Sequence, residues 1–323
     1  TKYLMSEEDL KSSQYENNVP GRTVGFFMMS VIIVFVAIWM SIQGNDKEST
    51  DLTEQSKLEN YSASLPSELR LPNLPLLGFV EVEAGEFLMG SNPLLDRLAY
   101  ENERWSSRQR QGEVYLPSFF ISRYETTIAQ FGVYADEIGL DMGQINLVGS
   151  PDLAAYNVTW SDAVGYASWL DSKLRSSPHT PERIKAMFEG GGRVTLPSEA
   201  EWEKAARSTD GRIFPWGSQP TSDFANFNAT EVYSVGSKPC DECAYGLSDM
   251  AGNVWEFTRS PLQDYPYDPA DDLDNLSEDA LWVMRGGSFA DGINNVRAAV
   301  RGAVDPGVRS KTIGFRVVIS SAP

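Results

Sequence analysis

The sequence predicts an α+β domain with little regular secondary structure, preceded by one transmembrane helix. Beyond residue 77, short strand-like and helix-like segments alternate irregularly with loops, unlike the regular strand–helix repeat of a parallel sheet. Residues 23–42 (TVGFFMMSVIIVFVAIWMSI) contain no charged side chain, and about 20 apolar residues are the length that crosses a bilayer.

The membrane span divides the chain into a tail, an anchor, a linker and a domain. Residues 23–42 read as a retained signal anchor, because no small-residue cleavage site follows them. Residues 1–22 then form a cytoplasmic tail, since basic residues precede the span. Residues 43–76 are a polar linker. Residues 77–323 are then expected on the outer side of the membrane, in the periplasm if it is a bacterial inner membrane or otherwise in another extracytoplasmic space.

Composition argues against a nucleic-acid partner and against one class of metal site. The formal net charge of −18 argues against nucleic acid as a partner, because phosphate backbones bind basic surfaces. The single histidine, His179, rules out a metal site built from three histidines.

Strand-like segments occur throughout the domain. Residues 79–83 alternate apolar and polar, and a glycine turn leads to residues 87–89, which predicts a hairpin. Residues 113–123 predict a strand pair that is broken at Pro117. Further strands are expected within residues 193–196, 283–289, 294–301 and 313–320.

Three helices are expected between these strands. Residues 127–139 and 161–175 carry apolar residues at helical spacing, and Thr159 or Ser161 caps the second helix. Ser198 begins an S-x-x-E capping box, which predicts the start of a third, short helix.

The segment 245–257 (YGLSDMAGNVWEF) combines two bends with two carboxylates. Its glycines and Asn253 tolerate a left-handed backbone, and Asp249 and Glu256 lie across the bends. Such a segment wraps a hard cation such as calcium, or it folds through its own turns and aromatic anchors.

Cys240 and Cys243 form an isolated C-x-x-C pair. A redox motif of this kind normally lies in a βαβ context, which the sequence lacks, and a zinc site needs four ligands. The preferred interpretation is a small structural disulfide, which also favours an oxidising compartment outside the cytoplasm.

A series of motifs runs through the domain from residue 77 to residue 319: VEAGEFLMGS, SRYETTIAQF, NVTWSDAVGYASWL, RVTLPSEAEWEKAAR, FPWG, FANFN, YGLSDMAGNVWEF, VMRGGSF and IGFRVV. In this order they resemble the formylglycine-generating enzyme family, the sulfatase-modifying-factor domain. The resemblance implies a C-type-lectin-like α+β fold, which agrees with the mixture of elements above.

The resemblance does not extend to the family's catalytic cysteines. The family enzyme uses copper, held by two cysteines that follow the GGS motif, to oxidise a sulfatase cysteine to formylglycine. The matching positions here are Asp291 and Val296, and neither supplies the thiolate that Cu(I) needs. A relative of the family uses iron held by histidines, which a single histidine excludes. We therefore expect neither copper nor iron, and no catalysis of the family's kind.

The resemblance does imply structural calcium. One family site uses two side chains and two backbone carbonyls, at the positions of Asp249, Gly252, Val254 and Glu256. A second site uses a side chain and the next carbonyl, which fall on Asn226 and Phe227. The alternative is that the two carboxylates only accept hydrogen bonds from turn amides.

Four further residues lie in the segment that forms the family's substrate groove: Arg285, Ser288, Asp291 and Arg301. They would contact a peptide or a partner protein there. The alternative, which we favour, is that the arginines are buried and donate to backbone carbonyls.

Three functional hypotheses follow. The first is a membrane-anchored, catalytically inactive accessory or structural subunit, whose partners are the membrane and other subunits of a membrane protein complex. The second is a periplasmic protein-modifying enzyme with an altered active site, marked by Arg285, Ser288 and Asp291 facing an open groove. The third is a calcium-dependent, lectin-like module that binds a ligand through its loops.

Overall fold

The computed structural model describes residues 65–143, 145–272 and 280–321. The predicted tail and membrane span lie outside these ranges, and no helix within them is long and apolar enough to cross a bilayer. Helix α2 (Leu65–Leu69) falls in the range predicted to be linker, yet Leu65 and Leu69 are buried in the core. The linker prediction was therefore too long at its C-terminal end, because apolar side chains there pack on the domain.

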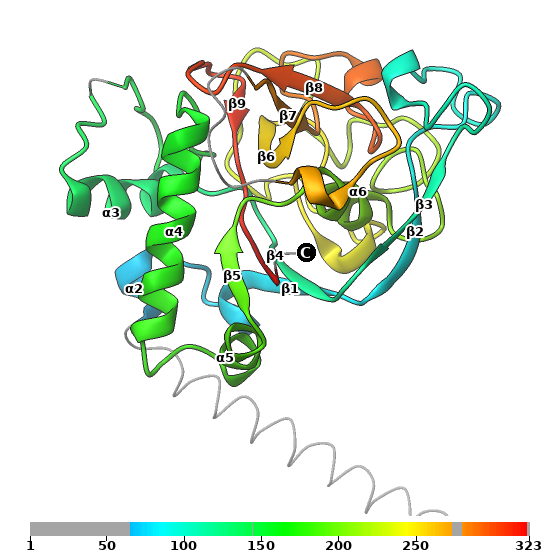
Figure 1. Ribbon diagram of the computed structural model, residues 1–323. Coiled ribbons are helices and arrows are strands. Elements are labelled where there is room, and N and C mark those ends of the chain that lie inside the picture. Colours follow the sequence, from blue (N-terminus) through cyan, green and yellow to red (C-terminus); the bar gives the residue numbers. More distant parts are fainter. Residues whose placement is uncertain (1–64, 144, 273–279, 322–323) are drawn as a thin grey trace, which may run out of the picture. The chain divides into compact units, whose positions relative to one another are not determined.

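Two four-stranded sheets make up most of the β structure (Figure 1). The first contains, in spatial order, β1 (Phe79–Val82), β4 (Phe119–Ser122), β10 (Val318–Ser321) and β5 (Gly192–Thr195). The second contains β8 (Arg301–Val304), β7 (Trp282–Arg285), β6 (Trp255–Pro261) and β9 (Ile313–Gly314). All neighbouring strands are antiparallel except β6 and β9.

The predicted hairpin within residues 79–89 is wrong. Strand β2 (Gly85–Met89) pairs with β3 (Gly112–Leu116), whereas β1 pairs with β4. Residues 79–89 therefore pair, strand by strand, with residues 112–122 and do not form a hairpin of their own. Pro117 lies at the break between β3 and β4 as predicted, since proline has no N–H to donate to a ladder.

The three predicted helices are confirmed as α3 (Ile128–Ile138), α4 (Trp160–Ser176) and α6 (Glu199–Arg207). Each begins with a capping box, formed by Thr127, Thr159 and Ser198 respectively. Helix α5 (Glu182–Glu189) was not predicted. Short 3-10 helices are η1 (Pro75–Gly78), η2 (Glu101–Glu103), η3 (Ala244–Gly246), η4 (Pro269–Asp271) and η5 (Ile293–Asn295).

The strand expected at residues 294–301 is wrong for most of its length. Its first residues belong to η5, and β8 begins only at Arg301. The apolar residues between them, Val296 and residues 298–300, are buried without strand pairing.

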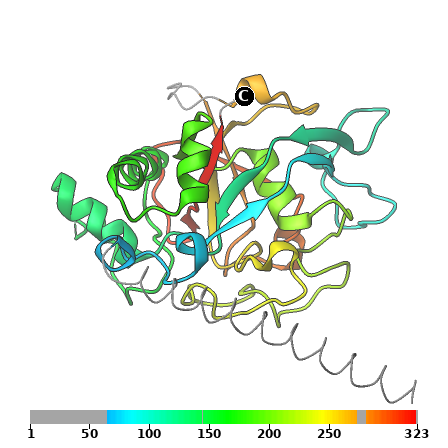
Figure 2. The same cartoon turned by 90° about the horizontal axis from the view of Figure 1, so that it is seen from below.

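Helices α3 and α4 lie together on one side of the domain (Figures 1 and 2), and an aromatic core joins them to the sheets. The Phe131 ring lies edge-on to Phe315, and Tyr166 contacts both. Trp160 of α4 stacks on Trp282 of β7 with ring centroids 4.0 Å apart. These large apolar side chains provide most of the driving force for folding this half of the domain.

Helix α6 is attached to the second sheet by buried ion pairs. Its glutamates at 199, 201 and 203 are each at most 5% exposed, so each requires a partner. Each accepts from an arginine on a different strand: Arg301 of β8 with Glu199 (2.5 Å), Arg259 of β6 with Glu201 (2.6 Å) and Arg285 of β7 with Glu203.

We expect Glu203→Gln to lower the free energy of unfolding by about 3 to 5 kcal/mol, because it removes the buried carboxylate that pairs with both Arg207 and Arg285 and leaves Arg285 only its longer contact with Glu199. The matched control is Glu182→Gln in α5, whose carboxylate is 83% exposed beside Lys185 and should change stability by less than about 0.5 kcal/mol. Urea unfolding of both variants measures the difference, and equal effects would contradict the structural role of the buried pair.

Asp272 is a buried carboxylate whose hydrogen-bond donors are neutral. It accepts from the hydroxyls of Ser260 and Tyr267. Burial raises the pKa of Asp272 to about 6, although Arg259 and the two hydroxyls oppose the rise. The folded state therefore holds this proton over a pH range in which the unfolded chain has released it.

Asp272 should consequently destabilise the fold as the pH rises from about 4 to about 6, by up to about 3 kcal/mol. Replacing it with Asn removes this penalty. As the pH rises over this range, we expect the unfolding free energy of the parent to fall relative to that of Asp272→Asn. Chemical denaturation at a series of pH values tests this, and a difference that does not vary with pH would refute it.

Candidate functional site

The segment 245–257 forms a turned loop that leads into β6, as its glycines and Asn253 suggested. Asp249, Gly252 and Asn253 all have positive φ, at 58°, 77° and 58°. A Cβ at Gly252 would lie 2.2 Å from the carbonyl oxygen of Asn226, so only glycine allows this contact. The loop is therefore fixed against the segment that contains Asn226.

The two carboxylates of this loop have different partners. Asp249 Oδ2 accepts from the backbone N–H of Gly236 at 2.6 Å. Glu256 accepts from Arg316 through both oxygens, at 2.6 and 2.7 Å, and from Trp202 Nε1 at 2.7 Å. The sequence predicted neither Arg316 nor Trp202 as a partner of Glu256.

A third carboxylate, Glu125, completes this buried cluster. It accepts from Asn253 Nδ2 at 2.5 Å and from Val254 N–H at 3.1 Å. Burial, followed by repulsion from Asp249 and Glu256, raises the pKa of Glu125 well above its ordinary value. No pattern in the sequence singled out Glu125, because it is a lone acidic residue at a strand–helix junction.

The pKa of Asp249 is also raised by these surroundings. Burial is the main reason that its pKa rises to about 6, and Glu256 adds to the rise, whereas Gly236 N–H and Arg316 oppose it. When all three carboxylates are ionised, Arg316 offsets only one of their charges. The cluster thus has an excess of negative charge that a bound cation would neutralise.

The donor set agrees with calcium chemistry in part. Asp249 and the Gly252 and Val254 carbonyls are hard oxygen donors of the kind that calcium binds. Among the described residues, no hydrogen bond to either carbonyl is found. Glu256 would have to share its oxygens with Arg316. No group of three His, Cys, Asp or Glu side chains arranged to hold a metal occurs in the described ranges, so carbonyls would have to contribute.

The second predicted calcium pair lies beside the first. Asn226 donates from Nδ2 to Asn253 Oδ1 and to the Glu231 carbonyl, both at 3.1 Å. Its own carbonyl accepts from Asn253 N–H at 2.8 Å. Phe227 packs beside a small apolar cluster. Asn226 therefore links the two predicted sites through Asn253.

Asp291 and Val296, the positions matched to the family's cysteines, are engaged internally. Asp291 Oδ2 accepts from Trp255 Nε1 at 2.9 Å and from the hydroxyl of Ser288 at 2.5 Å, while Oδ1 accepts from Asn295 Nδ2 at 2.7 Å. Val296 is fully buried against Phe214 and its neighbours. Asp291 thus acts as an acceptor that holds the RGGS turn.

Three of the four groove candidates are buried rather than presented in a groove. Arg285 is 0% exposed, Ser288 1% and Arg301 7%. Arg285 donates to Glu203 and to the Ala298 and Ala299 carbonyls. The two arginines thus occupy the buried positions of the favoured alternative, and their polar atoms are used inside the protein.

Cys240 and Cys243 form a disulfide with their Cα atoms 5.3 Å apart, as predicted. They are the only cysteines in the chain. The disulfide lies just before η3, at the entrance to the segment 245–257.

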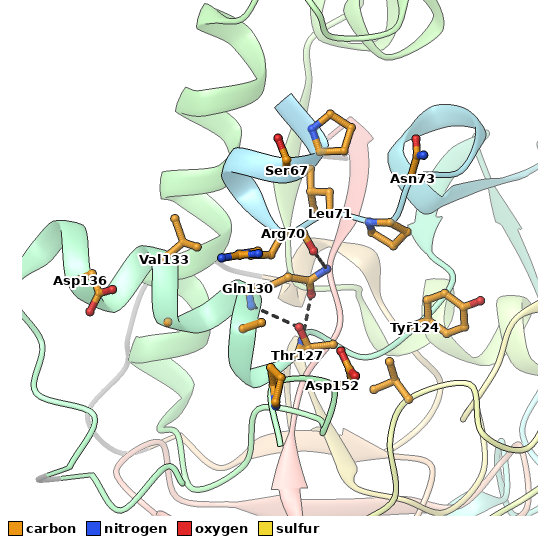
Figure 3. A pocket seen from close by; sticks show the side chains of 16 residues that line it. Ser67, Arg70, Leu71, Asn73, Tyr124, Thr127, Gln130, Val133, Asp136 and Asp152 are labelled. Atoms are coloured by element: carbon orange, nitrogen blue, oxygen red, sulfur yellow. Dashed lines mark hydrogen bonds between the residues drawn. The ribbon is translucent and has the colours of Figure 1, made fainter. Parts of the chain in front are cut away.

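One pocket, of about 840 Å³, lies between α2, α3 and the loop at Pro151 (Figure 3). Its floor contains the α3 capping box, in which Gln130 Nε2 also donates to the Arg70 carbonyl at 3.2 Å. Arg70, Asp136 and Asp152 bring charges to its walls. None of the residues predicted to form a site lines this pocket.

Comparison with known proteins places this geometry in a family. A family described as "Sulfatase-modifying factor enzyme 1-like domain" matches residues 68–321. Hercynine oxygenase of Mycolicibacterium smegmatis is 28% identical over 258 residues, which cover 65% of this chain and 54% of that protein. Inactive C-alpha-formylglycine-generating enzyme 2 of Bos taurus is 31% identical over 179 residues, covering 50% of this chain and 48% of that protein.

A solved structure also shares the fold. The structure of PvdO from Pseudomonas aeruginosa aligns with a TM-score of 0.60 and 25% identity, over 75% of this chain and 94% of that one. The chain spans about half the length of the curated relatives it matches. Because the family match extends over most of the sequence, this chain belongs to the sulfatase-modifying factor enzyme 1-like domain family.

Proposed function

We propose that this protein is a membrane-anchored, catalytically inactive member of its family that acts as an accessory subunit of a membrane protein complex. The observation that carries the proposal is the state of the two positions matched to the copper-binding cysteines. Asp291 uses its carboxylate to hold a turn, and Val296 belongs to an apolar cluster. The two cysteines of the chain are joined to each other.

An enzyme with an altered active site is less well supported. It requires Arg285, Ser288 and Asp291 to face an open groove, but Arg285 and Ser288 are almost completely buried. Relatives in the family include an oxygenase and a protein named inactive, so membership alone does not decide between the two functions.

The anchor and the accessory role predict stable association with other membrane subunits. The full chain, tagged and purified from native membranes in a mild detergent, should bring down integral membrane proteins in stoichiometric amounts. An unrelated single-span protein with the same tag defines the background. Recovery of the chain as a lone monomer would argue against the accessory role, and its recovery without membrane solubilisation would argue against the anchor.

Calcium is proposed as a structural ligand of the segment 245–257. Asp249, Gly252 and Val254 would supply oxygen atoms, and the ion would offset the excess charge of Glu125, Asp249 and Glu256. Its role would be to stiffen the loop rather than to take part in a reaction.

Calorimetry on the chelator-treated full chain should detect calcium binding, and calcium at about 100 times its Kd should stabilise the fold by about 2.7 kcal/mol. Asp249→Ala should abolish both the heat of binding and the stabilisation by calcium. In the absence of calcium, its melting temperature should stay close to that of the parent. Asp152→Ala, at an exposed carboxylate in the pocket of Figure 3, should retain the heat of binding and the stabilisation. No heat and no stabilisation in the parent would rule out both predicted calcium sites.

A further inference from the structure

The loop that follows β2 exposes an unusual group of apolar side chains. Leu94 is 70% exposed, Leu95 72%, Leu98 37% and Tyr100 43%. Single exposed leucines are normal on a protein surface, but four large apolar side chains within seven residues form a patch that needs a partner. We refer to residues 92–110 as the leucine loop.

The leucine loop is held in place by buried charges at its base. Arg297 is fully buried and pairs with Asp96 at 2.6 Å and with Glu103 at 2.6 Å. The N–H groups of Leu95 and Asp96 both donate to the Asn92 carbonyl at 2.9 Å. The fold therefore presents the two adjacent leucines in an ordered turn, so little conformational entropy remains to be lost on binding.

The exposed charges of the leucine loop are mainly positive. Arg97, Arg108 and Arg110 are exposed, and no ion pair of theirs occurs among the described residues. The acidic side chains Asp96 and Glu103 are buried against Arg297, which leaves Glu101 as the exposed carboxylate. The rest of the chain is strongly acidic, with a net charge of −18 overall. This contrast orients the loop toward a negatively charged surface and the remainder of the domain away from it.

We propose that the leucine loop docks on the surface of a bilayer that contains anionic lipid. Leu94 and Leu95 enter the boundary between headgroups and acyl chains, and the arginines pair with lipid phosphates. Tyr100 suits the same boundary because its ring is apolar and its hydroxyl is polar. Two neighbouring leucines at the tip of a turn fit a fluid interface without a matching cavity, whereas a protein partner would have to supply a pocket for them. Figures 1 and 2 both show this loop (cyan) at the edge of the domain remote from α3.

An environment-sensitive fluorophore on Leu95→Cys tests the proposal in the full chain, because the two natural cysteines are joined in a disulfide. The labelled chain is reconstituted in nanodiscs that contain no other membrane protein, made of phosphatidylglycerol with phosphatidylcholine or of phosphatidylcholine alone. We expect a blue shift and a rise in emission of about twofold or more in the anionic nanodiscs only, reduced at high salt. The same label on Val148→Cys, an apolar position 61% exposed on another loop, should not respond.

Charge reversal separates electrostatic docking from nonspecific contact. Arg97→Glu combined with Arg108→Glu should remove the response at position 95, whereas Arg183→Glu in α5, also exposed, should preserve it. Melting temperatures of both variants establish that the fold is intact. If the chain does not enter nanodiscs, the anchor proposal fails. The fluorescence of the label at position 95 is then measured after the same nanodiscs are added to the chain in solution. No response in anionic nanodiscs, or an equal response in nanodiscs of phosphatidylcholine alone, would overturn the proposal of docking on anionic lipid.

Discussion

The organisation of this domain depends on the burial of three glutamates along one short helix. Glu199, Glu201 and Glu203 of α6 cannot remain inside the protein as charges without cationic partners. Their arginines come from three neighbouring strands, β8, β6 and β7. Carboxylate and guanidinium groups pair only in particular geometries, so these contacts fix how α6 lies on the sheet. Apolar packing alone tolerates more variation.

The same constraint explains why segments with little regular structure can be ordered. The loop at Asp96 is tied to Arg297 and thereby to the segment that precedes β8. Glu256 is tied to Arg316 and thereby to the C-terminal strands. Long loops normally run over the surface and are more mobile than the elements they connect. Here, buried ionic contacts between distant segments take over the ordering that helices and sheets provide elsewhere.

Local features of the fold were predictable from the sequence, and long-range ones were not. The capping residues Thr159 and Ser198 act within three positions of themselves, and the apolar spacing of residues 127–139 is equally local, so all three helices could be placed correctly. The pairing of β1 with β4 and of β2 with β3 depends on partners far along the chain. A turn-forming glycine therefore suggested a hairpin that does not form.

The candidate site shows the same division. The resemblance to a known family identified Asp249 and Glu256, because the motif that contains them is continuous. The partners of these residues, Glu125 and Arg316, come from separate motifs and carry no recognisable spacing. Burial of Arg285 and Arg301 likewise depends on α6, which lies some eighty or more positions earlier in the chain. Charge pairing across such distances has no signature in a single sequence.

The position of β10 has a consequence for how the chain reaches this structure. β10 lies between β4 and β5, with Val318 in register with both Ile121 and Thr195. Val317 N–H also reaches the Ser122 hydroxyl across 195 residues. The β1–β4 part of this sheet and β5 thus remain unjoined until β10 has been synthesised and has inserted between them. Before β10 adds to it, the sheet exposes unpaired edges of β4 and β5, which can pair wrongly with other chains.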